Sequence, residues 1–134
     1  QAGDGGGHHF GRSLSGDGSG LLFAVTTVGR ILRSEDFGDS WVPVDTGLPR
    51  GEDRVIEGVQ SNDNFAASVT LDSERGRVYA GTKALGLFVS ANRGETWVSV
   101  PGTAGIADSA VSPDGTMLIA ERGGRLLELV PPSL

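Results

Sequence analysis

Cysteine is absent from the 134 residues, and Lys83 is the single lysine. The lack of cysteine excludes disulfides, thiolate catalysis, iron–sulfur clusters and cysteine-ligated zinc. Long apolar runs are also missing, since no segment reaches the roughly 18 residues that a membrane-spanning helix needs. Basic residues number 11 against 17 acidic ones, which gives a net charge of −6. This balance argues against binding to nucleic acid or to anionic membranes, because both require a basic surface.

Glycine, in contrast, is abundant, at 22 of the 134 residues. No collagen-like period accompanies it, so we assign it to turns. No stretch shows the i, i+3, i+4 apolar spacing of an amphipathic helix. A chain of this length accommodates one domain with a hydrophobic core of its own.

The sequence contains an internal repeat. The octets Ser34–Trp41 and Ser90–Trp97 share the form Ser-x-(Asp/Asn)-x-Gly-x-(Ser/Thr)-Trp, and their tryptophans lie 56 residues apart. A second recurrence is a turn centred on Asp17, Asp72 and Asp114, each between two apolar segments. Asp and Gly suit tight hairpins because these need a positive φ or an Asx hydrogen bond.

The repeat predicts an all-β fold built from units of up to four short strands. The expected strands are Phe10–Ser15, Leu21–Thr26, Arg30–Ser34, Trp41–Asp45, Phe65–Leu71, Val78–Thr82, Leu87–Ser90, Trp97–Val100, Ile106–Ser112, Met117–Glu121 and Arg125–Val130. Four-stranded units at this spacing are typical of β-propeller blades. Closed propellers have about four to eight blades, so these 11 strands, about two and three-quarter blades, predict an incomplete ring.

The two octets resemble Asp-boxes, also called BNR repeats. These occur in sialidases, sortilin-type receptor domains, xyloglucan-cleaving glucanases and photosystem II assembly factors. The resemblance implies that the octets are structural hairpin clips at the periphery, away from catalysis, and these families share the motif but not the chemistry. The matching residues are Ser34, Asp36, Gly38, Trp41, Ser90, Asn92, Gly94 and Trp97.

The connection between the first two units carries an insertion. Trp41 and Asp72 are 31 residues apart, whereas Trp97 and Asp114 are 17 apart, so about 14 residues are extra. We expect a flexible glycine-rich arm at 1–9, blade 1 at 10–45, the inserted loop at 46–64, blade 2 at 65–101, and a partial blade 3 without its outer strand at 102–134.

Propeller topology places the insertion on the same side as the turns between second and third strands. Loops beyond about 12–15 residues in a compact domain are usually functional or disordered, so this side is the candidate binding surface. The candidate ligand or partner residues are Arg30, Arg50, Asp53, Arg54, Glu57, Lys83 and Arg122. A solvated, variable loop without a function is the alternative.

No catalytic constellation is evident. Glycoside hydrolysis needs two carboxyl groups flanking the bond, and although Asp53 and Glu57 are available, their spacing does not single them out. The sialidase Arg-Ile-Pro signature is incomplete, since Leu32 replaces the proline. Sialidases also use a tyrosine nucleophile, and the only tyrosine here, Tyr79, lies inside an expected strand. The pair His8-His9 lacks a third ligand. We therefore expect no catalytic residue, metal or cofactor.

The expected last strand, Arg125–Val130, has no fourth strand beside it. An unpaired apolar edge is a template for association, so we expect a protein partner or the remaining blades to cover it; a frayed end of a truncated chain is the alternative. The favoured function is a non-catalytic interaction or scaffold module. The alternative is a fragment of a carbohydrate-active propeller, with a sugar ligand and catalytic residues elsewhere. A secreted, periplasmic or cell-surface location is favoured, and Gln1 suits a chain released by signal-peptide cleavage.

Overall fold

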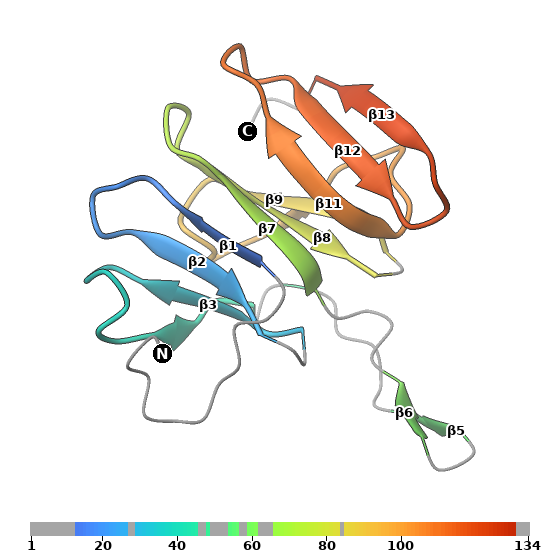
Figure 1. Ribbon diagram of the computed structural model, residues 1–134, viewed down its shortest axis with the longest axis horizontal. Helices are drawn as coiled ribbons and strands as arrows, with labels where there is room; N and C mark the ends of the chain where they lie inside the picture. The colour runs from blue at the N-terminus through green and yellow to red at the C-terminus, as the bar shows by residue number, and fades with distance from the viewer. Residues whose placement is uncertain are drawn as a thin grey trace.

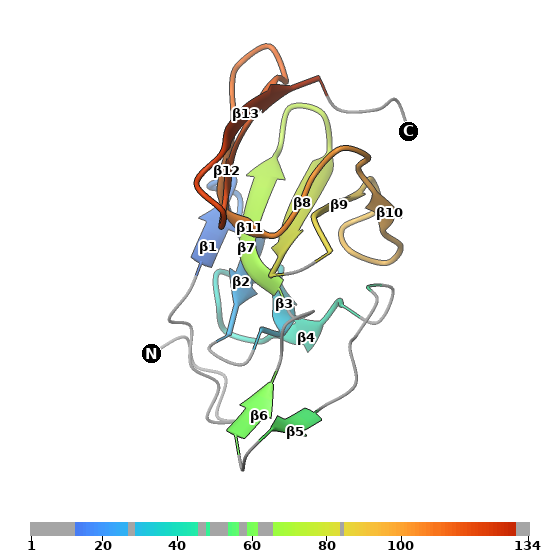
Figure 2. The same ribbon diagram turned by 90° about the vertical axis from the view of Figure 1, so that its right-hand side faces the viewer.

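The computed structural model describes residues 13–26, 29–45, 48, 54–56, 59–61, 66–83 and 85–130. The described part consists of strands and turns, with three sheets that fan out side by side and a separate two-stranded hairpin (Figures 1 and 2). Sheet 1 contains β1 (Ser13–Gly16), β2 (Leu22–Val25), β3 (Ile31–Ser34) and β4 (Val42–Pro43). Sheet 2 contains β7 (Ala66–Asp72), β8 (Arg77–Thr82), β9 (Leu87–Ser90) and β10 (Val98–Ser99). Sheet 3 contains β11 (Ile106–Val111), β12 (Met117–Glu121) and β13 (Leu126–Leu129).

Each sheet is a simple antiparallel meander in which strands that are consecutive in the chain are paired. The all-β class, the three sheets of four, four and three strands and the unclosed arrangement confirm the fold predicted from the repeat. The fourth strands are shorter than expected, because only two residues of β4 pair with β3 and only two of β10 pair with β9.

The sheets pack face to face across two seams. Phe23, Val25 and Ile31 of sheet 1 meet the sheet 2 face that carries Val78 and Ala80. The second seam is filled by Tyr79, Leu87, Val89, Ile106, Met117 and Ile119. Both seams bury aliphatic and aromatic side chains almost completely, and this burial is the main force that holds one sheet on the next.

The first strands β1, β7 and β11 adjoin one another (Figure 1), and a hydroxyl ties each neighbouring pair. Ser15 Oγ accepts a hydrogen bond from the Leu71 amide at 2.9 Å. Thr70 Oγ1 donates to the Ser109 carbonyl, also at 2.9 Å. Each seam is therefore fixed by polar contacts as well as by its apolar core.

The three sheets repeat one another residue by residue around the turn between their second and third strands. The amides of Thr26, Thr82 and Glu121 each donate to the carbonyl four residues on, at 2.9, 3.0 and 2.8 Å. This common register defines two sets of equivalent positions. In sheets 1 and 2 they lie on the face that packs against the following sheet, and in sheet 3 they lie on the corresponding face. These sets are Phe23, Tyr79 and Leu118, and Ile31, Leu87 and Leu126.

The inserted segment contains a hairpin that was not foreseen from the sequence. Strands β5 (Arg54–Ile56) and β6 (Val59–Ser61) pair antiparallel, with Arg54 opposite Ser61. Figures 1 and 2 both show these strands apart from the three sheets. The β-branched residues in both strands fit this pairing, whereas the charge and glycine of the segment had predicted a loop. The expected N-terminal arm at 1–9 lies outside the described residues.

Candidate functional site

Arg30, a candidate binding residue, is engaged in an internal ion pair. Its Nε and Nη2 donate to the two carboxylate oxygens of Asp45 at 2.7 and 2.9 Å, and this hydrogen bonding raises the pKa of Arg30. The Asp45 side chain is buried and also accepts from the Ile31 amide at 3.0 Å. The pair therefore fixes the end of sheet 1 and directs two of the five N–H donors of the guanidinium to Asp45.

Two other candidates lie close together at the second seam. Arg122 Nη1 donates to the Lys83 carbonyl at 3.2 Å, which links the turns of sheets 2 and 3. Next to them, Arg125 Nε contacts the Glu121 carboxylate at 2.7 Å and lowers the pKa of that carboxyl group. At this end of the molecule, Arg122 and Arg125 are therefore both held by contacts within the chain.

The remaining candidates fall in the insertion. Arg54 begins β5, while Arg50, Asp53 and Glu57 lie outside the described residues. Their approach to Arg30, Lys83 and Arg122 therefore stays a prediction from topology.

The octets form hydrogen-bonded hairpin loops. Ser34 Oγ accepts from the Gly38 amide at 2.8 Å, and Ser90 Oγ accepts from the Gly94 amide at the same distance. Asp36 accepts from both the amide and the hydroxyl of Ser40, at 2.9 and 2.6 Å. These bonds, the Ser40 hydroxyl first, lower the pKa of Asp36 to about 2.

Asn92 occupies the place of Asp36 in the second octet and makes the matching contacts. Its Oδ1 accepts from the Thr96 amide at 2.9 Å, and its Nδ2 donates to the Thr96 hydroxyl at 2.8 Å. Gly38 and Gly94 have φ values of 92° and 91°, the left-handed region that glycine adopts without strain. Phe37 and Arg93, one residue earlier, are also left-handed, at 57° and 61°.

The two octets also contact each other across the first seam. Arg33 Nη1 donates to the Arg93 carbonyl at 2.9 Å, and Arg93 Nη1 contacts the Glu35 carboxylate at 2.7 Å. The sequence alone indicated a clip for each separate hairpin. The long side chains of Arg33, Glu35 and Arg93 also connect the two hairpins to each other, and so connect sheet 1 to sheet 2.

Two clefts lined by described residues lie at the octet end, opposite the side that the sequence favoured. One, of about 370 Å³, lies between sheets 1 and 2, with Asp17, Leu71, Arg77 and Arg93 among its lining residues. From the sequence, Asp17 and Asp72 are expected only to form turns. The one sequence signal for clefts at this end is that both aspartates lie in turns at the same end of successive hairpins.

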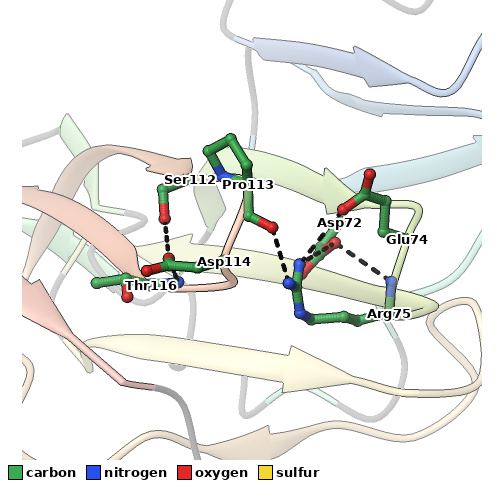
Figure 3. Close-up of polar contacts among 7 residues, drawn as sticks. All are labelled: Asp72, Glu74, Arg75, Ser112, Pro113, Asp114 and Thr116. Atoms are coloured by element: carbon green, nitrogen blue, oxygen red, sulfur yellow. Dashed lines mark hydrogen bonds and ion pairs between the residues drawn. The ribbon is translucent and has the colours of Figure 1, made fainter.

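The second cleft, of about 270 Å³, lies between the turns of sheets 2 and 3. Arg75 spans it, donating from Nη2 to the Pro113 carbonyl at 2.8 Å and contacting the buried Asp72 carboxylate at 3.3 Å (Figure 3). Asp114 accepts from the Ser112 hydroxyl and the Thr116 amide, and these bonds lower its pKa to about 2. The cluster in Figure 3 thus joins two turns by bonds within the chain.

A further surface is formed by the face of sheet 3 that is turned away from sheet 2. We call it the open face, and it consists of Asp108, Ala110, Leu118, Ala120, Leu126, Glu128 and Val130. Leu118, Leu126 and Val130 are 46%, 67% and 79% exposed. Such a group of exposed aliphatic side chains is a common mark of an interaction surface.

The edge beside the open face is also unpaired in the described part of the chain. Strand β13 has β12 on one side, and no described strand pairs with its other side. In sheets 1 and 2 the equivalent edge bonds to a fourth strand, where the carbonyls of Ile31 and Leu87 accept from Val44 and Val100 at 3.0 and 2.8 Å. The open end of sheet 3 therefore combines exposed apolar side chains with a free strand edge.

Within the described ranges, no group of three or more His, Cys, Asp or Glu side chains is placed to hold a metal ion. The described residues also contain no helix that is long and apolar enough to cross a membrane. His8 and His9 lie outside the described residues.

Solved structures similar to the chain are β-propellers. The structure of YCF48 bound to D1 peptide matches with a TM-score of 0.54 and 16% identity over 83% of this chain. The GH74 xyloglucanase from Xanthomonas campestris matches with a TM-score of 0.54 and 22% identity over 83% of the chain. The chain spans 33% of the first structure and 18% of the second. No protein-family model and no curated protein matches the sequence.

At these identities the likeness establishes the fold alone. Sheets 1, 2 and 3 are successive blades of a β-propeller, and the described residues form part of a ring.

Proposed function

We propose that this chain is part of an Asp-box β-propeller that serves as a non-catalytic protein-interaction module. The observation that carries the proposal is the open face, where Leu118, Leu126 and Val130 are exposed beside the unpaired edge of β13. Apolar surface that is removed from water on association stabilises a complex by roughly 25 cal/mol per Å² before the costs of binding. One of the similar propellers, YCF48, is bound to a D1 peptide in its solved structure, which supports a protein partner.

The octets support the Asp-box part of the proposal. Their hydrogen bonds and ring contacts are directed into the chain, and Trp41 Nε1 and Trp97 Nε1 both donate to backbone carbonyls. This arrangement stabilises hairpins and seams, as a structural motif should. An extracytoplasmic location belongs to the same proposal and rests on the resemblance alone.

The proposal is tested by the mass of the native assembly. The chain is produced with an affinity tag in its source cells and analysed by native mass spectrometry, alone and as Leu118→Ser/Leu126→Ser. We expect the wild-type chain in a complex with another protein and the double variant as the free chain. Leu14→Ser/Val98→Ser, which changes exposed aliphatic residues on sheets 1 and 2, is the matched control and should retain the complex.

The carbohydrate alternative is tested on the same samples. Xyloglucan oligosaccharides are titrated into the purified chain by calorimetry. Saturable binding to the chain, together with a free chain in the native mass spectrum, would contradict the interaction module and favour a piece of a carbohydrate-active propeller.

A further inference from the structure

The cleft of about 370 Å³ between sheets 1 and 2, which we call the first-seam cleft, is built from three parts of the chain. It lies between the turn after β1, the turn between β7 and β8, and the second octet. Leu21 and Leu71 line it and pack against the core of the first seam, so its base is apolar and fixed. Its volume lies within the range of ligand pockets, roughly 300–1,000 Å³.

The corresponding cleft at the second seam is bridged by the chain itself. There Arg75, from the turn of sheet 2, donates to the Pro113 carbonyl of sheet 3 and contacts Asp72 (Figure 3). The turn of sheet 1 at the same place consists of residues 18–20, Gly-Ser-Gly. These residues have no side chain that is long enough to bridge to the next sheet. The first-seam cleft therefore stays open where the second cleft is spanned by an arginine.

The charges that line the first-seam cleft favour an anion. Arg77, the first residue of β8, and Arg93, in the second octet, both line it. Arg93 Nη1 contacts the Glu35 carboxylate at 2.7 Å, but the Arg93 side chain is 61% exposed, so its guanidinium also faces water. Asp17 is the acid among the described lining residues, and its Oδ1 accepts from the amide and hydroxyl of Ser19 at 2.9 and 2.6 Å. The lining thus has a positive excess in a chain whose net charge is −6.

The two octets differ at the position that lines this cleft. Ala91, which is exposed, stands where the first octet has Glu35. The Glu35 carboxylate contacts the guanidinium groups of Arg33 and Arg93, at 3.5 and 2.7 Å. The second octet brings no such carboxylate to the arginines of the cleft. The alanine leaves both the space and the charge for a carboxylate from another molecule.

We propose that the first-seam cleft binds an acidic peptide segment of a partner protein. An aliphatic side chain of the peptide packs on the leucines at the base, and an aspartate or glutamate pairs with Arg77 and Arg93. Hydrogen bonds from guanidinium to carboxylate are about twice as strong as neutral ones. Asp17, on the sheet 1 side, accepts N–H groups, which a peptide backbone supplies. This inference goes beyond the proposed function, because the cleft lies at the octet end and contains no residue of the open face.

The test begins with a phage-displayed library of random heptapeptides. The library is selected on the full chain and counter-selected on Ala91→Glu, in which the new carboxylate occupies the arginines of the cleft. Glu35 shows that an octet accepts glutamate at this position. We expect enriched peptides to carry Asp or Glu within two residues of Leu, Ile, Val or Met. Ala91→Gln adds the same bulk without the charge and should bind these peptides better than Ala91→Glu does.

The most enriched peptide is then synthesised with a fluorophore, and its affinity is measured by fluorescence anisotropy. We expect Arg77→Gln and Arg93→Asn each to weaken binding about tenfold, as should replacement of the peptide's acid by its amide. Asparagine suits position 93 because it tolerates the left-handed φ of 61° there. Glu35→Gln is the matched control, since it removes the same ion pair but keeps the charge of Arg93, and the affinity should not fall.

The outcomes separate this inference from the proposed function. No enriched consensus, or a basic consensus that imitates Arg75 at the second seam, would overturn the inference. Acidic peptides that bind Ala91→Glu or the two arginine variants as well as the wild-type chain would also overturn it. Leu118→Ser/Leu126→Ser alters the open face alone and should bind the peptide with unchanged affinity. Loss of binding in that variant would overturn the cleft assignment and leave the interaction module standing, whereas cleft binding with an intact native complex of that variant would contradict only the proposed function.

Discussion

The indole of Trp97 donates from Nε1 to the carbonyl of Val44 at 2.9 Å and so joins the second octet to the first sheet. The Trp41 indole instead donates to Gly38 within its own octet, at 3.0 Å. Trp97 also packs against the core of the first seam. The two tryptophans occupy the same place in the repeat, but the Trp97 indole donates across a seam and the Trp41 indole donates within its own loop.

This difference predicts unequal costs of truncation. We expect Trp97→Ala to lower the free energy of unfolding by about 3 kcal/mol, the low end for a large aromatic residue because the ring is half-buried. Trp41→Ala should cost about half as much, because its indole hydrogen bond is confined to one loop. Urea unfolding measures both. Equal losses would contradict a role of Trp97 in holding the sheets together.

Asp36 predicts a specific acid sensitivity. Its pKa is held at about 2, well below the ordinary value of 3.8, so the folded state favours the carboxylate. The stability that it contributes is present above pH 4 and is lost as the pH falls through about 2. Asp36→Asn should flatten this part of the stability profile, because Asn92 shows that the octet accepts an amide at this place. Asp39→Asn, in the same octet, is the control, and thermal unfolding from pH 7 to pH 2 is the measurement.

The Arg30–Asp45 pair predicts that Arg30 acts mainly in folding. Asp45→Ala should destabilise the chain by about 2–3 kcal/mol, less than a fully buried pair because the Arg30 side chain keeps contact with water. Arg30→Lys keeps the charge but loses the two-pronged geometry, and should cost about 1 kcal/mol. Denaturant unfolding checks both. If Arg30→Lys left stability unchanged and weakened the native complex, Arg30 would be a binding residue, as the sequence alone suggested.

The close approach of Arg75 to Gly115 predicts that a side chain at position 115 destabilises the turn at the second seam. A methyl group added at Gly115, where φ is 90°, would lie 2.6 Å from Arg75 Nε. We expect Gly115→Ala to displace the Arg75 side chain and to destabilise the turn by about 1–2 kcal/mol. Gly18→Ala is the matched control for the backbone term, because φ there is 81° but no atom lies within 4 Å. A similar loss in both variants would show that the contact with Arg75 is unimportant.

Much of the fold was predictable because the repeat is local. The octets and the turn aspartates mark hairpin ends, so the 11 strands of the three sheets followed from short segments. The contacts that join one sheet to the next were not predictable in the same way. Trp97 with Val44, and Arg33 with Arg93, connect residues 53 and 60 positions apart, and no sequence period reports such pairs.

The candidate site was predicted less well, also for a physical reason. Charge in the insertion and in nearby turns drew attention to Arg30, but a charged side chain serves folding when a buried partner such as Asp45 lies beside it. The exposed edge after Glu121 was foreseen from the missing fourth strand. The partial burial of Leu127 and Leu129 on one face and the exposure of Leu126 on the other required the structure.

Amide hydrogen exchange at β13 tests the central claim most directly. Ile31 and Leu87, the equivalents of Leu126, direct their backbone polar groups toward the fourth strand of their sheets. The amides of Leu126 and Glu128 therefore point toward the open edge, whereas those of Leu127 and Leu129 point toward β12. We predict fast exchange at Leu126 and Glu128 in the purified chain and slowing of at least about a hundredfold in the native assembly, because a covered edge exchanges only after opening. Slow exchange at both amides in the purified chain, or equal rates in the chain and the assembly, would contradict the account.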